Sequence, residues 1–265
     1  MTADDAAARF SNRVADYVRA RPSYPPAAID FVLANVLAEA DSTQADGAKS
    51  LTIADVGAGT GISAALFLAR GATVVAIEPN AAMRGAAEKL LGGNPRFRSV
   101  DGTAETTTLP DRSVDLVVAA QAFHWFDVPR ARWEFARITR APSRCALLWN
   151  TRRPSGSPFL AAYESLLAEF GLDYAQVRHE NIEAAALEQF FVPGTYRSRK
   201  FENVQRLDLD GLIARLASSS YLPSVEHPRY AAMLDAARKM YAEQQRDGGV
   251  DLVYDAEVHF GCVSA

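Results

Sequence analysis

A glycine-rich loop with an acid just before it is the part of this sequence best suited to ligand binding. The run Asp55-Val56-Gly57-Ala58-Gly59-Thr60-Gly61 follows an apolar stretch and opens a segment with helical spacing. Glycines tolerate positive φ and let a ligand lie against bare backbone. At the carboxyl end of a first parallel strand, such a loop lies where α/β sheets bind nucleotides. The alternative is a tight strand-to-helix turn that needs glycine only for its geometry.

A second acid stands where a ribose could be held. Glu78 ends the next apolar run, 21 residues after Gly57, and a carboxylate there can accept hydrogen bonds from two adjacent hydroxyls. The alternative is an acid favoured by a helix dipole. Asp55 would repel a pyrophosphate and suits a ligand with an ammonium and a sulfonium. Ile62 breaks the GxGxxG spacing, which disfavours a nicotinamide-dependent oxidoreductase, and no P-loop pattern occurs.

Four motifs together resemble those of class I S-adenosylmethionine (SAM)-dependent methyltransferases. The last of them, AQAFHWF, narrows the resemblance to the type 11 group, which includes ubiquinone-biosynthesis C-methyltransferases and trans-aconitate O-methyltransferases, and its form is most similar to the latter. The resemblance covers about residues 10–150 and implies SAM as cofactor, S-adenosylhomocysteine (SAH) as product and no metal. The motifs are Asp55–Gly61, Val75–Asn80, Asp115–Val118 and Ala120–Phe126.

The resemblance implies a role for each matching position. The glycine loop and Asp55 would face the methionine part of SAM, Glu78 the ribose, and residues 102–105 the adenine. Many relatives carry an acid where Thr103 stands, and that carboxylate usually contacts the adenine N6. Here the Thr103 hydroxyl or backbone groups would make this contact instead. Gln121 would approach SAM or the entrance to the acceptor site. The expected cofactor-binding residues are Asp55, Gly57, Ala58, Gly59, Gly61, Glu78, Pro79, Thr103, Ala104, Glu105 and Gln121.

His124 is the candidate for acceptor chemistry. It follows the fourth apolar run, and a neutral imidazole there could deprotonate an acceptor or orient it. A third reading is a packed aromatic corner in which the histidine has only a structural role. The transfer itself needs alignment more than acid–base chemistry, so the sequence leaves these three readings open.

The N-terminal segment and two later positions could close over the site. Tyr17 and Arg21 are four residues apart and would share a helix face, and in the family this helix tends to cover SAM. The alternative is a proline-broken helix end whose tyrosines simply pack. Arg152 and Arg153 could bind an acidic acceptor or be ordinary surface residues. The expected substrate or cofactor lid comprises Tyr17, Arg21, Tyr24, Trp125 and Asn150.

The acceptor expected from these features is a small molecule, with O-methylation of a carboxylate first and C-methylation of a quinone-like or other ring second. A SAM-binding regulator without transfer activity is the third possibility. No Asn/Asp-Pro-Pro-Tyr or Pro-Cys motif supports methylation of nucleic-acid bases, and no carboxylate trio suggests a Mg²⁺ site. Whether the protein is a monomer or a homodimer is left open.

Apolar runs alternating with helical segments predict an α/β fold, a doubly wound, Rossmann-like, seven-stranded, mostly parallel sheet whose final strand is antiparallel. Helices are expected near 6–19, 27–40, 61–70, 81–91, 128–140, 159–170, 182–191, 212–218 and 229–244. Strands are expected at Leu51–Val56, Thr73–Ile77, Phe97–Val100, Val114–Ala119, Cys145–Trp149, Arg197–Leu207 and Leu252–Cys262.

One domain over 1–265 is expected, with helical caps at 1–48 and 154–195, a SAM-binding core at 49–153 and the last two strands and helices in 196–265. The composition, 49% hydrophobic and 23% charged, is that of a globular protein. A net charge of −4 without a basic run disfavours nucleic acid as a partner. No apolar run is long enough for a membrane span or a signal peptide. With two isolated cysteines, a cytoplasmic setting is expected.

Overall fold

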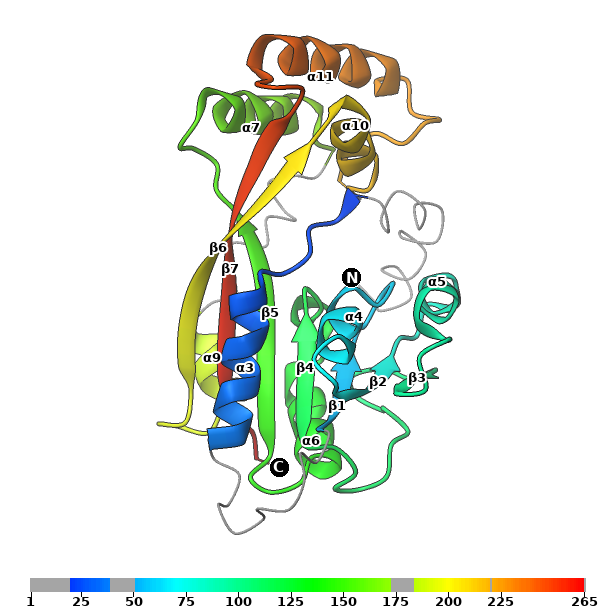
Figure 1. Cartoon of the computed structure of the whole chain (residues 1–265), viewed down its shortest axis with the longest axis vertical. Coiled ribbons are helices and arrows are strands. Elements are labelled where there is room, and N and C mark those ends of the chain that lie inside the picture. Colours follow the sequence, from blue (N-terminus) through cyan, green and yellow to red (C-terminus); the bar gives the residue numbers. More distant parts are fainter. Residues whose placement is uncertain (1–19, 39–50, 173–183, 220, 265) are drawn as a thin grey trace.

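The computed structural model describes residues 20–38, 51–172, 184–219 and 221–264. Its centre is a seven-stranded sheet in the order β3-β2-β1-β4-β5-β7-β6 (Figure 1). Only β7 runs antiparallel to its neighbours, so the expected fold class is confirmed. The strands are β1 Thr52–Val56, β2 Thr73–Ile77, β3 Phe97–Val100, β4 Leu116–Ala120, β5 Arg144–Arg152, β6 Arg197–Leu207 and β7 Val250–Cys262.

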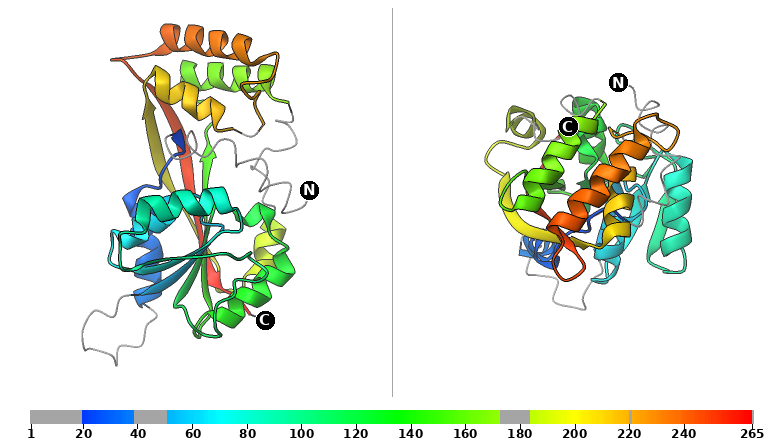
Figure 2. Two further views of the ribbon diagram at one scale, coloured as in Figure 1. Left: turned by 90° about the vertical axis from the view of Figure 1, so that its right-hand side faces the viewer. Right: turned by 90° about the horizontal axis from the view of Figure 1, so that it is seen from above.

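Helices cover both faces of the sheet, which explains why its central strands are apolar throughout. On one face, α3 (Pro26–Ala38) and α4 (Ile62–Leu68) bury Ile29, Val32 and Phe67 against the strands. On the other, α6 (Val128–Ile138) and α9 (Ala184–Phe190) bury Phe135 and Phe190. The layers are visible in the side view of Figure 2. α5 (Ala81–Leu91) packs beside β3 at the edge of the sheet.

Three further helices form a cap beyond the sheet. They are α7 (Pro158–Phe170), α10 (Leu209–Ala217) and α11 (Tyr230–Gln244), which lie together at one end of the molecule (Figures 1 and 2). Their apolar sides share one cluster that includes Leu167, Leu212 and Met233. The last residues of β6 and the first of β7 pair only with each other, from Val204–Val253 to Leu207–Val250. This two-stranded ribbon carries the cap away from the sheet.

The composition of the cap corrects part of the expected organisation. Of the described helices within the two expected caps, α7 alone belongs to it, because α3 and α9 have apolar faces that pack against the sheet. The two helices expected in 196–265 are present as α10 and α11, and they pack in the cap with α7. The expected helix at residues 6–19 lies outside the described residues. Within those residues, no helix is both long and apolar enough to cross a membrane.

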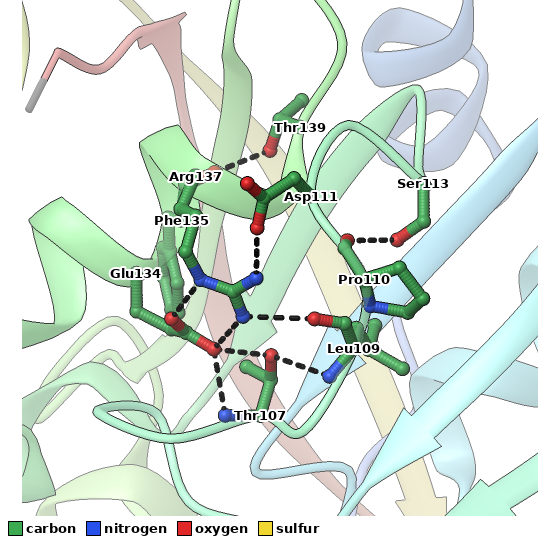
Figure 3. Close-up of polar contacts among 9 residues, drawn as sticks. All are labelled: Thr107, Leu109, Pro110, Asp111, Ser113, Glu134, Phe135, Arg137 and Thr139. Carbon is green, nitrogen blue, oxygen red and sulfur yellow. Dashed lines mark hydrogen bonds and ion pairs between the residues drawn. The ribbon is translucent and has the colours of Figure 1, made fainter.

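A buried ion pair ties α6 to the segment after β3, as Figure 3 shows. Glu134 accepts hydrogen bonds from the Thr107 amide at 2.9 Å and from Arg137 Nε and Nη2, both at 2.7 Å. Arg137 Nη2 also donates to the Leu109 carbonyl at 2.8 Å. Burial alone would raise the pKa of Glu134, but these donors outweigh it and lower that pKa. The network fixes the segment whose earlier residues form a wall of the site described below.

Glu134→Ala should lower the free energy of unfolding by on the order of 3 kcal/mol, because the Thr107 amide loses its acceptor and Arg137 loses the more buried of its two carboxylate partners, keeping only Asp111. The pair Asp235–Arg238 on α11 is the matched control, since it has the same three-residue spacing but side chains that are 77% and 52% exposed. Asp235→Ala should change stability by less than about 0.5 kcal/mol. Urea unfolding of both variants measures this. Equal losses would show that burial does not distinguish the two pairs.

Candidate functional site

The candidate site lies where the chain reverses its direction of travel across the sheet. β1 sits between β2 and β4, and connections from this point run to opposite edges, which opens a crevice at the carboxyl ends of the strands. A cleft occupies that position, with a floor made by the loops after β1, β2, β3 and β4. Its opposite wall includes residues of α10 and β7 from the cap side. The cleft is therefore enclosed by two separately packed layers.

The glycine loop forms the centre of the floor. Gly57 has φ +70°, and a Cβ placed there would lie 2.5 Å from the Cβ of Ala122. The amides of Gly57 and Ala58 both donate to the Ile77 carbonyl, at 2.9 and 3.1 Å. The loop is thus held close to the end of β2 and to the segment after β4. Only glycine combines this positive φ with so close an approach to Ala122 without strain.

The carboxylate of Glu78 is held at the end of β2 and lines the cleft. Its Oε2 accepts from the Gly59 amide and its Oε1 from the Asn80 amide, both at 2.9 Å. Burial raises the pKa of Glu78, while these two amides act in the opposite direction. Each carboxylate oxygen retains further acceptor capacity. The side chain is fixed in place with unused lone pairs available to a ligand.

Asp55 takes a different position from the one expected. It is fully buried, does not line the cleft, and accepts at 2.7 Å from the hydroxyl of Ser63 in α4. Burial raises the pKa of Asp55 to about 7. Its Oδ1 has no hydrogen-bond partner among the described residues. The carboxyl group therefore supports the start of α4 from below the loop.

Most of the expected site residues meet in this one cleft. Gly61 does not line it, because it is the N-cap of α4 and a Cβ there would lie 2.7 Å from Leu91. Tyr17 lies outside the described residues. The expected residues that do line the cleft are Arg21, Tyr24, Gly57, Ala58, Gly59, Glu78, Pro79, Thr103, Ala104, Glu105, Gln121, Trp125 and Asn150.

Backbone hydrogen bonds shape the side walls of the cleft. Thr103 and Thr106 exchange amide-to-carbonyl bonds of 3.1 and 3.3 Å, which makes a tight turn after β3. Glu105 accepts at 2.9 Å from the amide of Asp127, so it links this turn to α6. Gln121 has φ +55°, and its side-chain amide donates to the Asn150 carbonyl at 3.3 Å. The two walls are rigid because each is bonded to its neighbour.

The N-terminal segment crosses the cleft mouth through polar contacts. Arg21 donates to the carbonyl of Ser218 in the turn after α10 at 2.8 Å. The side-chain amides of Asn150 and Asn203 both donate to the Ser23 carbonyl, at 3.2 and 2.6 Å. Of the two readings of this segment, these contacts favour a cover over the site. It bonds to β5, to β6 and to the cap.

Arg152 and Arg153 do not line the cleft. Arg152 pairs with Glu164 at 2.6 Å, and Arg153 pairs with Asp255 at 2.6 Å and Glu202 at 2.8 Å. Their guanidiniums thus bind carboxylates of this chain itself. This corrects the expectation that the two arginines face an acidic acceptor.

Sequence reasoning missed the two polar residues that the cap side contributes. Arg215 of α10 and Tyr254 of β7 line the cleft, and both are buried. A signal for Arg215 exists in the sequence, because it shares one helix face with Leu212, Leu216 and Ser219 at helical spacing. A charged residue on the apolar face of a helix is predicted to be buried when that face packs.

His124 lies in a short 3-10 helix, η1 (Phe123–Trp125), and does not line the cleft. Its ring packs against that of Trp125, with 4.7 Å between centroids. Phe123 on the same turn is buried in the sheet core and contacts Phe190 edge-on at 4.8 Å. The aromatic corner therefore presents Trp125 to the cleft and keeps His124 behind it. Of the three readings of His124, the geometry favours a structural role.

His124→Ala should therefore lower the melting temperature while leaving kcat within about threefold of wild type, because a general base would contribute ~10²–10⁴. Trp125→Ala is the matched comparison. It removes the neighbouring ring that lines the cleft, and it should raise KM for the acceptor because binding surface is lost. Steady-state kinetics and thermal unfolding of both variants test this. A hundredfold loss of kcat in His124→Ala, with the fold intact, would instead support a role for His124 as general base.

Metal ligands do not gather in the described part of the chain. There, no group of three or more His, Cys, Asp or Glu side chains is placed to hold an ion. Cys145 is buried in β5, where burial raises the pKa of its thiol well above the usual range. The polar side chains that line the cleft carry carboxylates, amides, hydroxyls of Thr, Ser and Tyr, and guanidiniums.

Comparison with known proteins agrees with this geometry. Residues 54–147 match the family profile described as "Methyltransferase domain". An uncharacterized methyltransferase of Mycobacterium tuberculosis is 40% identical over 148 residues, which is 56% of this chain. The match spans about half of that relative, 54% of its length. An uncharacterized methyltransferase-like protein of Schizosaccharomyces pombe is 28% identical over 92% of this chain and 91% of its own.

Solved structures support the fold. A structure from Anaeromyxobacter dehalogenans, described as a type II methyltransferase, aligns with a TM-score of 0.64 and 22% identity over 92% of this chain and 98% of its own. An Anabaena variabilis structure aligns with a TM-score of 0.58 and 19% identity over 92% of this chain and 99% of its own. The resemblance carried by the glycine loop and the motifs after it is confirmed. Residues 54–147 of the chain match the family described as a methyltransferase domain.

Proposed function

We propose that this protein transfers a methyl group from SAM to a small molecule, preferably to a carboxylate oxygen. The observation that carries the proposal is the carboxylate of Glu78, fixed by the amides of Gly59 and Asn80 beside a glycine loop. A carboxylate so placed matches the paired hydroxyls of a ribose. Around the glycine loop, the floor of the cleft has neither lysine nor arginine among its described residues, as suits a cofactor without phosphates.

The residues present fit SAM in three further respects. The bare backbone of Gly57 and Gly59 leaves room for the methionine part. The turn of Thr103 to Glu105 lies on the side reached from β3, where an adenine would stack. Gln121 borders the floor beside the loop, where the reacting methyl would point. When bound, SAM supplies a methyl group on a positively charged sulfur.

The chain's contribution to the reaction is alignment and exclusion of water. A carboxylate acceptor is ionised at neutral pH, so no residue has to remove a proton. This agrees with the position of His124 outside the cleft. Glu78 and the loop would fix one reactant, while the cap wall and the N-terminal segment would enclose the other. Such positioning can supply about 7–11 kcal/mol of the barrier.

Titration calorimetry with SAM, SAH and NAD tests the cofactor. SAH should bind with a Kd on the order of 1–100 µM, and it should raise the melting temperature because it binds only the folded state. NAD should not bind. Absence of SAM and SAH binding to folded protein would refute the proposal. Detection of SAH formed from SAM with an acceptor, in a screen of metabolite extracts with methyl-labelled SAM, separates an enzyme from a SAM-binding regulator.

A further inference from the structure

The cap wall of the cleft contains an arginine, Arg215, that has no carboxylate partner among the described residues. Arg215 is 6% exposed, and its side chain lines the same cleft as the glycine loop. Figure 1 shows α10, which carries it, on the side of the cap that faces the carboxyl ends of the central strands. A buried charge is costly unless it is paired and hydrogen-bonded, so its partners decide its role.

Only neutral groups contact Arg215 among the described residues. Its Nε donates to the hydroxyl of Tyr254 at 3.3 Å and its Nη1 to the hydroxyl of Ser219 at 3.0 Å. No carboxylate of the described ranges lies within 4.0 Å of it, whereas Arg152 and Arg153 both have one. A guanidinium carries five N–H donors, so three have no bond in this part of the chain. The positive charge is buried but not neutralised there.

A second unsatisfied polar group lies in the same region. Tyr163 of α7 is fully buried, its hydroxyl has no hydrogen-bond partner in the described residues, and it interacts electrostatically with Arg215. Tyr254 lines the cleft beside Arg215, and its hydroxyl donates onward to Gln205 at 3.2 Å. Because the single O–H of Tyr254 is used on Gln205 and Tyr163 does not line the cleft, the remaining N–H groups of Arg215 are the donors suited to an anion.

The charges along the cleft are separated. The floor carries the acids Glu78 and Glu105, and the cover and cap carry the cations Arg21 and Arg215. The acidic side suits a positively charged cofactor. The basic side, formed by the cover and the cap, lies away from the glycine loop. It is therefore available to the methyl acceptor.

We infer that Arg215 is a specificity-determining residue that binds a carboxylate on the methyl acceptor. The planar fork of a guanidinium matches a carboxylate through two parallel hydrogen bonds, and the singly negative group neutralises one buried cation. The acceptor would thereby supply a negative charge that no described residue places beside Arg215. This inference rests on the proposed function and names the acceptor class of that same site.

The test compares carboxylates with their neutral amides on the full chain saturated with SAH. The probe pairs are hexanoate and hexanamide, benzoate and benzamide, and trans-cinnamate and cinnamamide, each measured by titration calorimetry. At least one acid should bind more tightly than its amide. Arg215→Gln should lower the affinity for that acid about tenfold or more, since charged hydrogen bonds are worth ~1.5–3 kcal/mol. The affinity for the amide should be nearly unchanged.

Arg153→Gln is the matched control. It removes the same charge from an arginine that is 40% exposed and paired with Asp255 and Glu202 outside the cleft, so acid binding should stay at the wild-type level. Each variant is first shown to be folded and to bind SAH as the wild type does. Failure of the wild type to bind SAH would overturn the proposed function instead.

Two milder variants keep the test decisive if Arg215→Gln does not fold. Arg215→Lys keeps the charge but loses the fork, and Tyr254→Phe removes the hydroxyl beside it. Each should weaken acid binding several-fold without changing amide binding. The inference is overturned if no acid binds better than its amide at up to about 10 mM. It is also overturned if the acid preference survives unchanged in the folded Arg215 variants.

Discussion

Glu78→Ala is expected to weaken SAH binding at least tenfold and up to roughly a thousandfold. The carboxylate can accept two charge-assisted hydrogen bonds from ribose hydroxyls, each worth ~1.5–3 kcal/mol, and tenfold in affinity corresponds to about 1.4 kcal/mol. The loss should be large because the amides of Gly59 and Asn80 already fix the side chain. Binding then requires little ordering of the carboxylate. Titration calorimetry measures the change directly.

Glu88→Ala is the matched control for this prediction. Glu88 is an exposed acid on α5 and does not line the cleft, so its removal should leave SAH affinity unchanged. Glu78→Gln should fall between the two, because it keeps the shape but loses the charge. Equal SAH affinity in Glu78→Ala and wild type would mean that the acid serves only the end of β2 and the start of α5.

The same variant should separate binding from stability through pH. Burial raises the pKa of Glu78, so the ionised form opposes folding. Its contribution to stability is fully present below the unfolded pKa and is lost as pH rises through the folded value. The difference in melting temperature, wild type minus Glu78→Ala, should therefore decrease as the pH rises above about 4. The loss of SAH affinity should persist at neutral pH.

The sheet and the cofactor side of the cleft were predictable because their signals are local. The strand β2 and the helix α5 have the bounds expected from the sequence, since apolar runs are followed directly by cap residues. Asn80 accepts from the amides of Ala82 and Met83, as an N-cap does. In a doubly wound sheet, the loops after consecutive strands meet at one edge. Motif order alone therefore places Gly57 near Glu78.

The acceptor side was not predictable in the same way. Each helix of the cap was expected close to its observed residues, but which helices pack together depends on the ribbon formed by the ends of β6 and β7. That pairing joins residues far apart in the chain. Arg152 and Arg153 seemed suitable only because their partners Glu164 and Asp255 are distant in sequence. For His124, side-chain packing determines that the neighbouring ring of Trp125 lines the cleft and the imidazole does not.

Gly57→Ala should both destabilise the fold, by on the order of 3 kcal/mol, and abolish measurable SAH binding, because two separate costs add at this position. An L-residue at φ +70° costs roughly 1–2 kcal/mol. The new Cβ would also lie 2.5 Å from the Cβ of Ala122, so the loop or the segment after β4 must shift. A shift of the loop would move Gly59, whose amide holds Glu78. A shift of the segment after β4 would move Gln121 and Ala122, which line the cleft. Thermal unfolding and SAH titration measure the two losses.

Two further variants separate the costs. Gly248 has φ +72° and nothing within 4 Å of an added Cβ, so Gly248→Ala isolates the conformational cost, and SAH affinity should not change. Ala122→Gly, combined with Gly57→Ala, removes the contact and should recover part of the stability and some SAH binding, a coupling seen only between residues that touch. If the double variant is no better than Gly57→Ala alone, the backbone conformation is the whole reason for glycine here. If Gly248→Ala costs as much as Gly57→Ala, the close approach of the loop to Ala122 contributes nothing.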